Sequence, residues 1–179
     1  MKVIILIAEG FEEIETATVY DVLKRAGVDV ITAGLNAGTI TGSRGLKIVV
    51  DEKIGKRNVS DIDGLVVPGG YPGYVNLANS PEALKLIKEM ADKGKHLAAI
   101  CAGPVVLEKA GVITGRTVTC FPGMEGELQT ALFSPERVVQ DGNIITSRGP
   151  GTALDFALKL AEAWVSPDVA RKLREEMVA

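Results

Sequence analysis

Val3-Ile4-Ile5-Leu6-Ile7-Ala8, close to the N-terminus, is apolar without a break and rich in β-branched residues. A strand with one face in water alternates apolar and polar side chains, so this run predicts a strand that is buried on both faces. Strands of that kind belong to parallel sheets that helices cover on each side. The run therefore favours an α/β fold.

The residues that follow complete a first β-α-β unit. Val19, Val22 and Leu23 recur at helical spacing, and Gly27 supplies a stop before a second strand at 28–33. Elsewhere the patterns predict strands at 62–67, 97–100, 117–119, 138–140 and 144–146, and a hairpin-like excursion over 39–50. They predict further helices that begin after Ser80, at Val105, after Pro150 and after Ser166. Strands that alternate with helices imply a doubly wound, mostly parallel sheet sandwiched by helices, which places ligands beyond the carboxyl ends of the strands.

Length and charge limit the classes of function. A chain of 179 residues is long enough for one well-filled core, so residues 1–179 are expected to form one domain. The 20 Lys and Arg residues are interspersed with 23 Asp and Glu residues, which leaves no basic stripe for nucleic acid or an anionic membrane. The first apolar run is too short for a signal peptide or a membrane span, so a cytoplasmic location is expected.

The chain has few histidine and cysteine residues to bind a metal. Its two cysteines, Cys101 and Cys120, cannot build a disulfide scaffold and are expected to be free thiols. The single histidine, His96, rules out a multi-histidine metal site, and structural zinc is not expected. His96 precedes the strand at 97–100 and is expected at the opposite end of the sheet from Cys101, which argues against a Cys-His pair.

Three glycine-containing turns follow predicted strands and are expected to converge at one edge of the sheet. They are Glu9-Gly10, Pro68-Gly69-Gly70 and Cys101-Ala102-Gly103. A residue that leaves a buried strand and enters a helix sits on a sharp, often strained turn, which is a nucleophile's position. The helix N-terminus behind Cys101 is expected to stabilise a thiolate and lower the pKa of that cysteine. The alternative is a buried, inert cysteine.

Backbone amides and one carboxyl complete the predicted site. Gly69 and Gly70 lack side chains, so their amides and that of Ala102 could bind an oxyanion, although the glycines could also serve only a tight turn. Four acids, Glu9, Glu12, Glu13 and Glu15, lie where the first strand becomes a helix, and most are expected to be solvated partners of the helix dipole. A buried glutamic acid beside Cys101 would stay protonated and donate to a thiolate, but periodicity does not choose which one.

Cys120 has two interpretations. It is either a resolving thiol for an oxidised Cys101 or, as favoured here, a small apolar residue at a strand end.

Four motifs, in order, resemble the ThiJ/PfpI superfamily, and within it the branch of the Parkinson-disease-associated protein deglycase and its bacterial relatives. The likeness runs from Val3 to about Ala163. The motifs are Ala8-Glu9-Gly10-Phe11-Glu12-Glu13-Ile14-Glu15-Thr16, Val67-Pro68-Gly69-Gly70, Ala98-Ala99-Ile100-Cys101-Ala102-Gly103-Pro104 and Thr146-Ser147-Arg148-Gly149-Pro150-Gly151-Thr152.

The resemblance implies a flavodoxin-like sandwich that works as a homodimer without a cofactor. It implies that Cys101 is the nucleophile and Glu15 its protonated partner, with the amides of Gly70 and Ala102 at the oxyanion position. Arg44 and Arg148 match family arginines near the dimer interface and the site. Two positions depart from the family pattern. Ala102 stands where some members have a histidine that supports peptidase activity. Phe121 stands where other members have a histidine that precedes a proline. A peptidase is therefore disfavoured, and the absence of a histidine at position 121 weakens the case for efficient catalysis.

The leading hypothesis is an enzyme that converts methylglyoxal, glyoxal or early glycation adducts through Cys101, in protection against stress. Its partners would be small carbonyl compounds or glycated proteins and amino acids. The alternative is a redox-sensing stress or chaperone protein that responds to oxidation of Cys101 to a sulfinic acid. A glutamine amidotransferase would need a catalytic histidine after Cys101, and none follows it.

Overall fold

The first strand, β1 (Lys2–Ile7), lies inside a parallel sheet and pairs with a neighbour on each side. In the computed structural model, which describes residues 1–179, β1 pairs with β2 (Asp29–Gly34) and with β6 (Gly64–Val67). Val3 lies opposite Val30 on one side and opposite Gly64 on the other. The prediction of a strand that is buried on both faces is therefore confirmed.

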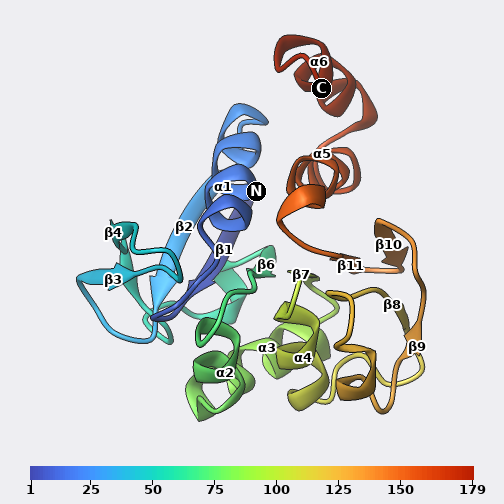
Figure 1. Cartoon of the computed structure of the whole chain (residues 1–179). Helices are drawn as coiled ribbons and strands as arrows, with labels where there is room; N and C mark the ends of the chain where they lie inside the picture. The colour runs from blue at the N-terminus through green and yellow to red at the C-terminus, as the bar shows by residue number, and fades with distance from the viewer.

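The main sheet has seven strands in the order β10-β11-β7-β6-β1-β2-β5, and only β10 runs antiparallel to its neighbour (Figure 1). Its remaining strands are β5 (Glu52–Lys53), β7 (His96–Ile100), β10 (Val138–Asp141) and β11 (Ile144–Ser147). The strand order reverses between β1 and β6, as in doubly wound folds. The predicted α/β class with a mostly parallel sheet is confirmed.

Five of the six helices cover the two faces of this sheet, and the last helix, α6 (Pro167–Glu176), packs on α5 (Ala153–Trp164) (Figure 1). The other four are α1 (Glu13–Arg25), α2 (Gly73–Ala78), α3 (Pro81–Asp92) and α4 (Gly103–Lys109). Val3, Ile5 and Ile7 of β1 pack in one buried cluster with residues of α1, α5 and α6, while Ile4 and Leu6 pack in the other with residues of α2, α3 and α4. None of the helices has the length and apolar character needed to cross a membrane.

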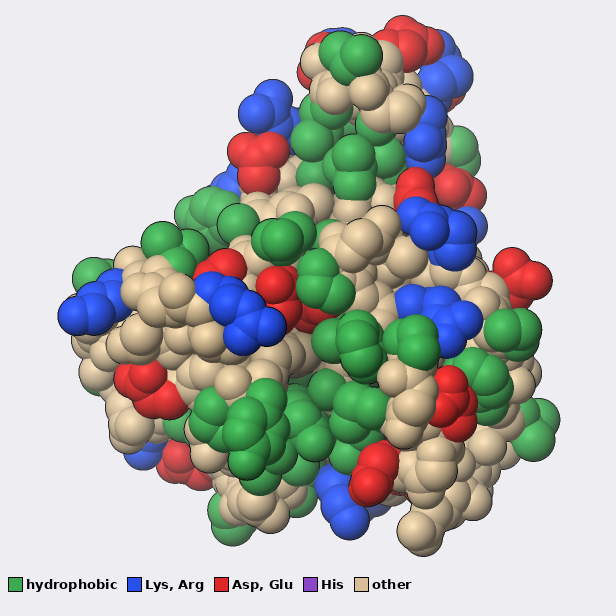
Figure 2. All heavy atoms as spheres, viewed as in Figure 1, with side chains coloured by type: hydrophobic (Ala, Val, Ile, Leu, Met, Phe, Trp, Pro, Cys, Tyr) green, Lys and Arg blue, Asp and Glu red, His purple; other side chains and the backbone are tan.

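Two small strand pairs lie outside the main sheet. The predicted excursion is an antiparallel hairpin of β3 (Thr39–Thr41) and β4 (Lys47–Val49). The predicted strand at 117–119 forms β8 (Thr117–Val118), which pairs with β9 (Leu132–Phe133) rather than with the main sheet. Figure 2 shows basic and acidic side chains interspersed on one face of the molecule, with hydrophobic side chains gathered over α2.

Candidate active site

Cys101 lies on the turn between β7 and α4 in a strained backbone conformation. Its φ angle is +63°, a left-handed value that residues other than glycine rarely adopt. The surrounding backbone holds this conformation, because the N–H of Cys101 donates to the carbonyl of Ser147 at 3.0 Å and its carbonyl accepts from the N–H of Phe121 at 2.9 Å. The side chain is almost wholly buried, with 9% of the residue exposed. Strain of this kind persists where surrounding contacts fix it, and it occurs often at functional sites.

The turn after β6 lies directly against this cysteine. A Cβ atom added to Gly69 would lie 2.7 Å from Cβ and 2.9 Å from Sγ of Cys101, so only glycine leaves room for the thiol. Gly70 has a φ of +93° and packs against the backbone of Gly10 and Glu12. The predicted convergence of the three glycine-containing turns is therefore present.

Two backbone amides point at the sulfur of Cys101. Those of Gly70 and Ala102 act as hydrogen-bond donors to it, and both lower the pKa of the thiol. The amide of Gly69 does not join them, because it donates to Oε2 of Glu15 at 2.8 Å. Sequence reasoning grouped Gly69 with the oxyanion-binding residues, but this geometry makes it the group that orients the acid.

Glu15 is the acid that reaches the cysteine. It lies in the first turn of α1 and is 0% exposed. Its Oε2 accepts from Gly69, while its buried Oε1 has no hydrogen-bond partner. Burial, together with the negative charge of Glu12, raises the pKa of Glu15 to about 7 against the opposing effect of the Gly69 bond. Glu15 can therefore hold a proton near neutral pH and release it at little cost.

The carboxyl groups of the other three acids accept hydrogen bonds that fix the start of α1 and the β3-β4 hairpin. Glu12 caps α1 by accepting from the N–H of Glu15 at 2.8 Å. Glu9 accepts from the N–H of Thr41, and Glu13 accepts from the hydroxyl of Ser43, so both tie the β3-β4 hairpin to the turn after β1. The structure thus separates one buried carboxyl from three structural ones, a distinction that the spacing of the four acids did not reveal.

The pKa of Cys101 differs from the expectation drawn from its helix N-terminus. Burial raises the pKa of the thiol, and the negative charge of the neighbouring Glu15 raises it further, which together outweigh the two amides. The predicted lowering is therefore wrong for the resting site. Protonation of Glu15 removes the repulsion between the two groups and leaves a donor beside the sulfur.

Phe121 and Arg148 lie next to the cysteine turn without contributing a proton carrier. The ring of Phe121 packs on Gly149, where an added Cβ would lie 3.1 Å from it. The guanidinium of Arg148 donates to the carbonyl of Pro135 at 2.9 Å and lies 5.9 Å from the ring of Phe133.

The remaining predicted residues lie outside the immediate site. Arg44 is exposed at the tip of the β3-β4 hairpin, where its N–H donates to Glu13. His96 begins β7 at the end of the sheet opposite Cys101, as predicted, and its ring lies 5.6 Å from that of Trp164. Cys120 is 0% exposed and belongs to the buried cluster under α3 and α4, an environment that suits an apolar role.

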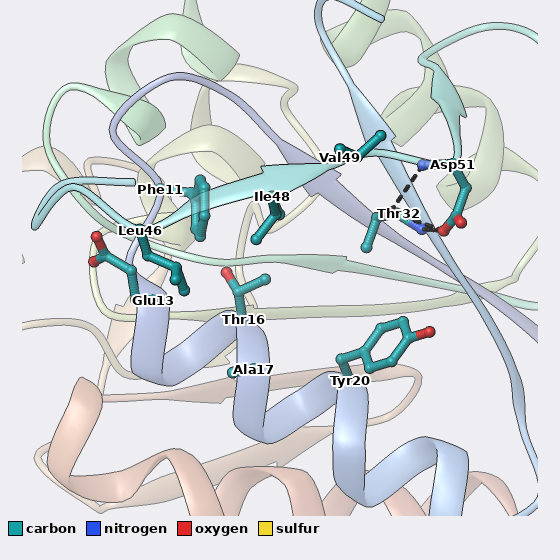
Figure 3. Close-up of a pocket in the computed structure, with 10 residues that line it drawn as sticks. All are labelled: Phe11, Glu13, Thr16, Ala17, Tyr20, Thr32, Leu46, Ile48, Val49 and Asp51. Carbon is teal, nitrogen blue, oxygen red and sulfur yellow. Dashed lines mark hydrogen bonds between the residues drawn. The ribbon is translucent and has the colours of Figure 1, made fainter. Parts of the chain in front are cut away.

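A cavity of about 290 Å³ lies beside α1, but neither Cys101 nor Glu15 lines it (Figure 3). Thr16, Ala17 and Tyr20 of α1 form one side of it, and the hairpin residues Leu46, Ile48 and Val49 form another (Figure 3). Tyr20, Leu46 and Val49 are 37%, 51% and 75% exposed. This cavity belongs to an apolar surface next to the cysteine site rather than to the site itself.

Comparison with known proteins places this arrangement in a family. The model of the DJ-1/PfpI family matches residues 1–163, which include Glu15, Gly69, Gly70 and Cys101. This chain belongs to the DJ-1/PfpI family.

Relatives within the DJ-1/PfpI family match most of the chain. Protein dj-1beta of Drosophila melanogaster is 41% identical over 89% of this chain and 87% of its own length. A protein named deglycase from Pyrococcus abyssi is 39% identical over 84% of this chain and 92% of its own length. Protein DJ-1 homolog B of Arabidopsis thaliana is 39% identical over 90% of this chain, which spans only 37% of that longer protein.

Solved DJ-1 structures share the fold over nearly the whole chain. The crystal structure of Drosophila melanogaster DJ-1beta superposes with a TM-score of 0.95 at 37% identity, covering 99% of this chain and 97% of that one. Oxidized DJ-1 of Toxoplasma gondii superposes with a TM-score of 0.93 at 31% identity, over 99% of this chain and 97% of that one.

Proposed function

We propose that this protein is a cysteine-dependent, cofactor-free glyoxalase or deglycase that acts on methylglyoxal, glyoxal or early glycation adducts. One observation carries the proposal: Glu15, with a pKa of about 7 and an unpartnered Oε1, is buried beside Cys101. A carboxyl with that pKa accepts and returns protons at neutral pH, which is what addition of a thiol to a carbonyl requires. The Pyrococcus relative named deglycase supports the same chemistry.

The reaction of a 2-oxoaldehyde follows from these groups. The sulfur of Cys101 bonds to the aldehyde carbon as the thiol proton passes to ionised Glu15, which then gives that proton to the carbonyl oxygen held by the amides of Gly70 and Ala102. Glu15, ionised again, takes the C1 proton of the hemithioacetal and delivers it to C2, while the C1 hydroxyl proton moves to the ketone oxygen, which gives a thioester of the hydroxy acid. Water cleaves the S–C bond, releases the hydroxy acid and restores the thiol. The aldehyde carbon is oxidised and the ketone carbon is reduced, so no external oxidant or reductant is consumed.

Formation of lactate from methylglyoxal, without glutathione, tests this proposal. We expect turnover by the wild-type protein and by Cys120→Ser, and none by Cys101→Ser. The two serine variants make a matched pair, because each removes one of the two thiols. Equal turnover by Cys101→Ser would refute the proposed nucleophile.

A second candidate function is redox sensing through Cys101. It is supported by the Toxoplasma relative, whose structure was solved in an oxidized form. The amides of Gly70 and Ala102 and the carboxyl of Glu15 would also serve as partners for the oxygens of a sulfinate. Intact mass after mild peroxide tests this function: a gain of two oxygens that Cys101→Ser abolishes would support it, and oxidation that persists in Cys101→Ser would count against it.

We propose that residues 1–179 act as one domain, in the cytoplasm, as a homodimer. The apolar surface beside α1 supports the dimer, because Tyr20, Leu46 and Val49 are large hydrophobic residues left exposed there. Light scattering after size exclusion tests it. A mass of twice 18.9 kDa that falls to the monomer value in Val49→Glu would support this interface, and an unchanged dimer in that variant would place the interface elsewhere.

A further inference from the structure

Phe121 is an exposed aromatic residue fixed beside the cysteine turn. It is 42% exposed, yet its backbone and its ring are both held in place. Its N–H donates to the carbonyl of Cys101 at 2.9 Å, and its carbonyl accepts from the N–H of Met124 at 3.1 Å. An exposed aromatic ring on a segment that is hydrogen-bonded to the cysteine turn offers apolar surface to a molecule that approaches this turn.

Gly149 provides the space for this ring. A Cβ atom at Gly149 would lie 3.1 Å and 3.5 Å from Cδ2 and Cε2 of Phe121, so a side chain there would push the ring away. Gly149 follows β11 by two residues, and the carbonyl of Ser147 in β11 accepts from the N–H of Cys101. The ring of Phe121 therefore packs on the segment after β11, and the backbone of Phe121 is hydrogen-bonded to the turn after β7.

The polar groups around Phe121 are buried or lie close to other partners, and the carboxyl of Glu125 lies 4.0 Å from the guanidinium of Arg148. The hydroxyl of Thr119 is buried, and the single histidine lies at the other end of the sheet. The guanidinium of Arg148 donates to Pro135 and lies near the ring of Phe133. Glu15 is therefore the carboxyl buried beside Cys101, and the ring of Phe121 adds exposed apolar surface next to the cysteine turn.

We infer that Phe121 is a specificity-determining residue, and that the site prefers 2-oxoaldehydes with an aromatic or bulky apolar substituent over glyoxal. The inference rests on the proposed function and names its substrate class. Glyoxal presents only hydrogen where phenylglyoxal presents a ring, so removal of apolar contact at Phe121 weakens selection between them. Because Phe121 is partly exposed, its truncation is not expected to unfold the protein.

The test compares kcat/KM for phenylglyoxal and glyoxal in wild type, Phe121→Ala and Phe121→Leu. We expect the ratio to fall about tenfold or more in Phe121→Ala and to recover in part in Phe121→Leu. Phe133→Ala is the matched control, because Phe133 is a phenylalanine of similar exposure, 39%, that packs near Arg148 instead. An unchanged ratio in Phe121→Ala, or an equal fall in Phe133→Ala, would overturn the inference.

A second readout does not require turnover. The rate of Cys101 alkylation by phenacyl bromide, divided by that for iodoacetamide, should fall in Phe121→Ala and stay unchanged in Phe133→Ala. If neither oxoaldehyde is converted but this ratio falls, the proposed function is wrong, while the preference of the site for apolar groups at Phe121 is supported. If the oxoaldehydes are converted and both ratios stay constant, the inference about Phe121 fails while the proposed function stands.

Discussion

The backbone N–H of Gly69 donates to Oε2 of Glu15 at 2.8 Å, and the other carboxyl oxygen, Oε1, is buried without a partner. An oxygen that already accepts a hydrogen bond is the poorer site for a proton, so the proton of neutral Glu15 belongs on Oε1. That is the oxygen left free to serve the thiol of Cys101. Gly69 therefore packs against Cys101 and orients the carboxyl of Glu15, which links the turn after β6 to the turn after β7.

Glu15→Gln should make the protein more stable at neutral and higher pH. The pKa of this carboxyl is raised from 4.5 to about 7 on folding, so the folded state binds more protons than the unfolded state between these values. Stability therefore decreases as pH rises from about 4.5 to about 7, and a shift of this size corresponds to ~3 kcal/mol. Glutamine removes this pH dependence but gives the N–H of Gly69 a weaker acceptor. The free energy of unfolding of Glu15→Gln is therefore expected to exceed that of the wild type by ~1–3 kcal/mol at pH 8.

Urea unfolding of both proteins at pH 4 and pH 8 measures this effect. The two free energies of unfolding should nearly coincide at pH 4 and separate at pH 8. A wild-type protein that is as stable as Glu15→Gln at pH 8 would contradict the raised pKa.

Gly69→Ala should impair both stability and turnover. The added methyl group would lie 2.7 Å from Cβ of Cys101, so the turn must shift and the bond to Glu15 must lengthen. Overpacking of this kind costs ~1–3 kcal/mol. Thermal unfolding and the lactate assay measure the two effects. Gly126→Ala serves as the control because no atom lies within 4 Å of its added Cβ, and equal behaviour of the two variants would refute the proposed role of Gly69.

Cys101→Gly should be more stable than Cys101→Ala, although neither has a thiol. A residue with a Cβ pays ~1–2 kcal/mol in the left-handed conformation that this position adopts at φ +63°, and glycine does not. The greater entropy of the unfolded glycine chain offsets part of that gain. Chemical denaturation of both variants should show Cys101→Gly ahead by ~0.5–1 kcal/mol. The opposite order would mean that the turn is not strained by its side chain.

Acid should loosen the β3-β4 hairpin before the rest of the protein unfolds. Partial burial tends to raise the pKa of Glu13, but hydrogen bonds from the backbone of Arg44, from Ser43 and from neighbouring amides outweigh it and lower the pKa. A depressed carboxyl pKa stabilises the fold above the unfolded value of 4.5, and that contribution is lost as pH falls through the folded value. Amide exchange of Arg44 between pH 6 and pH 3 measures the change. Glu13→Gln should show fast exchange throughout, and a wild-type amide that is equally protected at both ends of the range would contradict this role.

Strong local patterns allowed much of the fold to be predicted from the sequence. The apolar run at 3–8 and the glycines after the helices are features of short segments, and β1, β2, α1 and the doubly wound order follow from them. By contrast, β5 and β9 have only two residues each, and α2 has six residues without a side-chain cap, so no periodicity marks them. Their positions depend on pairing and packing with distant segments.

The candidate site was predictable in its parts but not in its electrostatics. The residues of the turn at Cys101 are contiguous. The choice of Glu15 among four acids came from the family resemblance and not from periodicity, because its burial depends on an amide that lies 54 residues away. The lowered pKa predicted for Cys101 came from the helix N-terminus alone. Burial and the charge of Glu15 act in the opposite direction, and both arise only when distant turns meet.

Lactate formation from methylglyoxal by Glu15→Gln, measured without glutathione and beside its unfolding free energy, tests the central claim most directly. The claim is that Glu15 moves protons for Cys101, so we expect kcat/KM to fall by a factor of ~100 or more while the variant remains folded and at least as stable as wild type. Glu13→Gln, which changes a structural carboxyl in the same helical turn, should retain nearly full activity. If Glu15→Gln converts methylglyoxal within twofold of the wild-type rate, the paired mechanism of Cys101 and Glu15 is wrong.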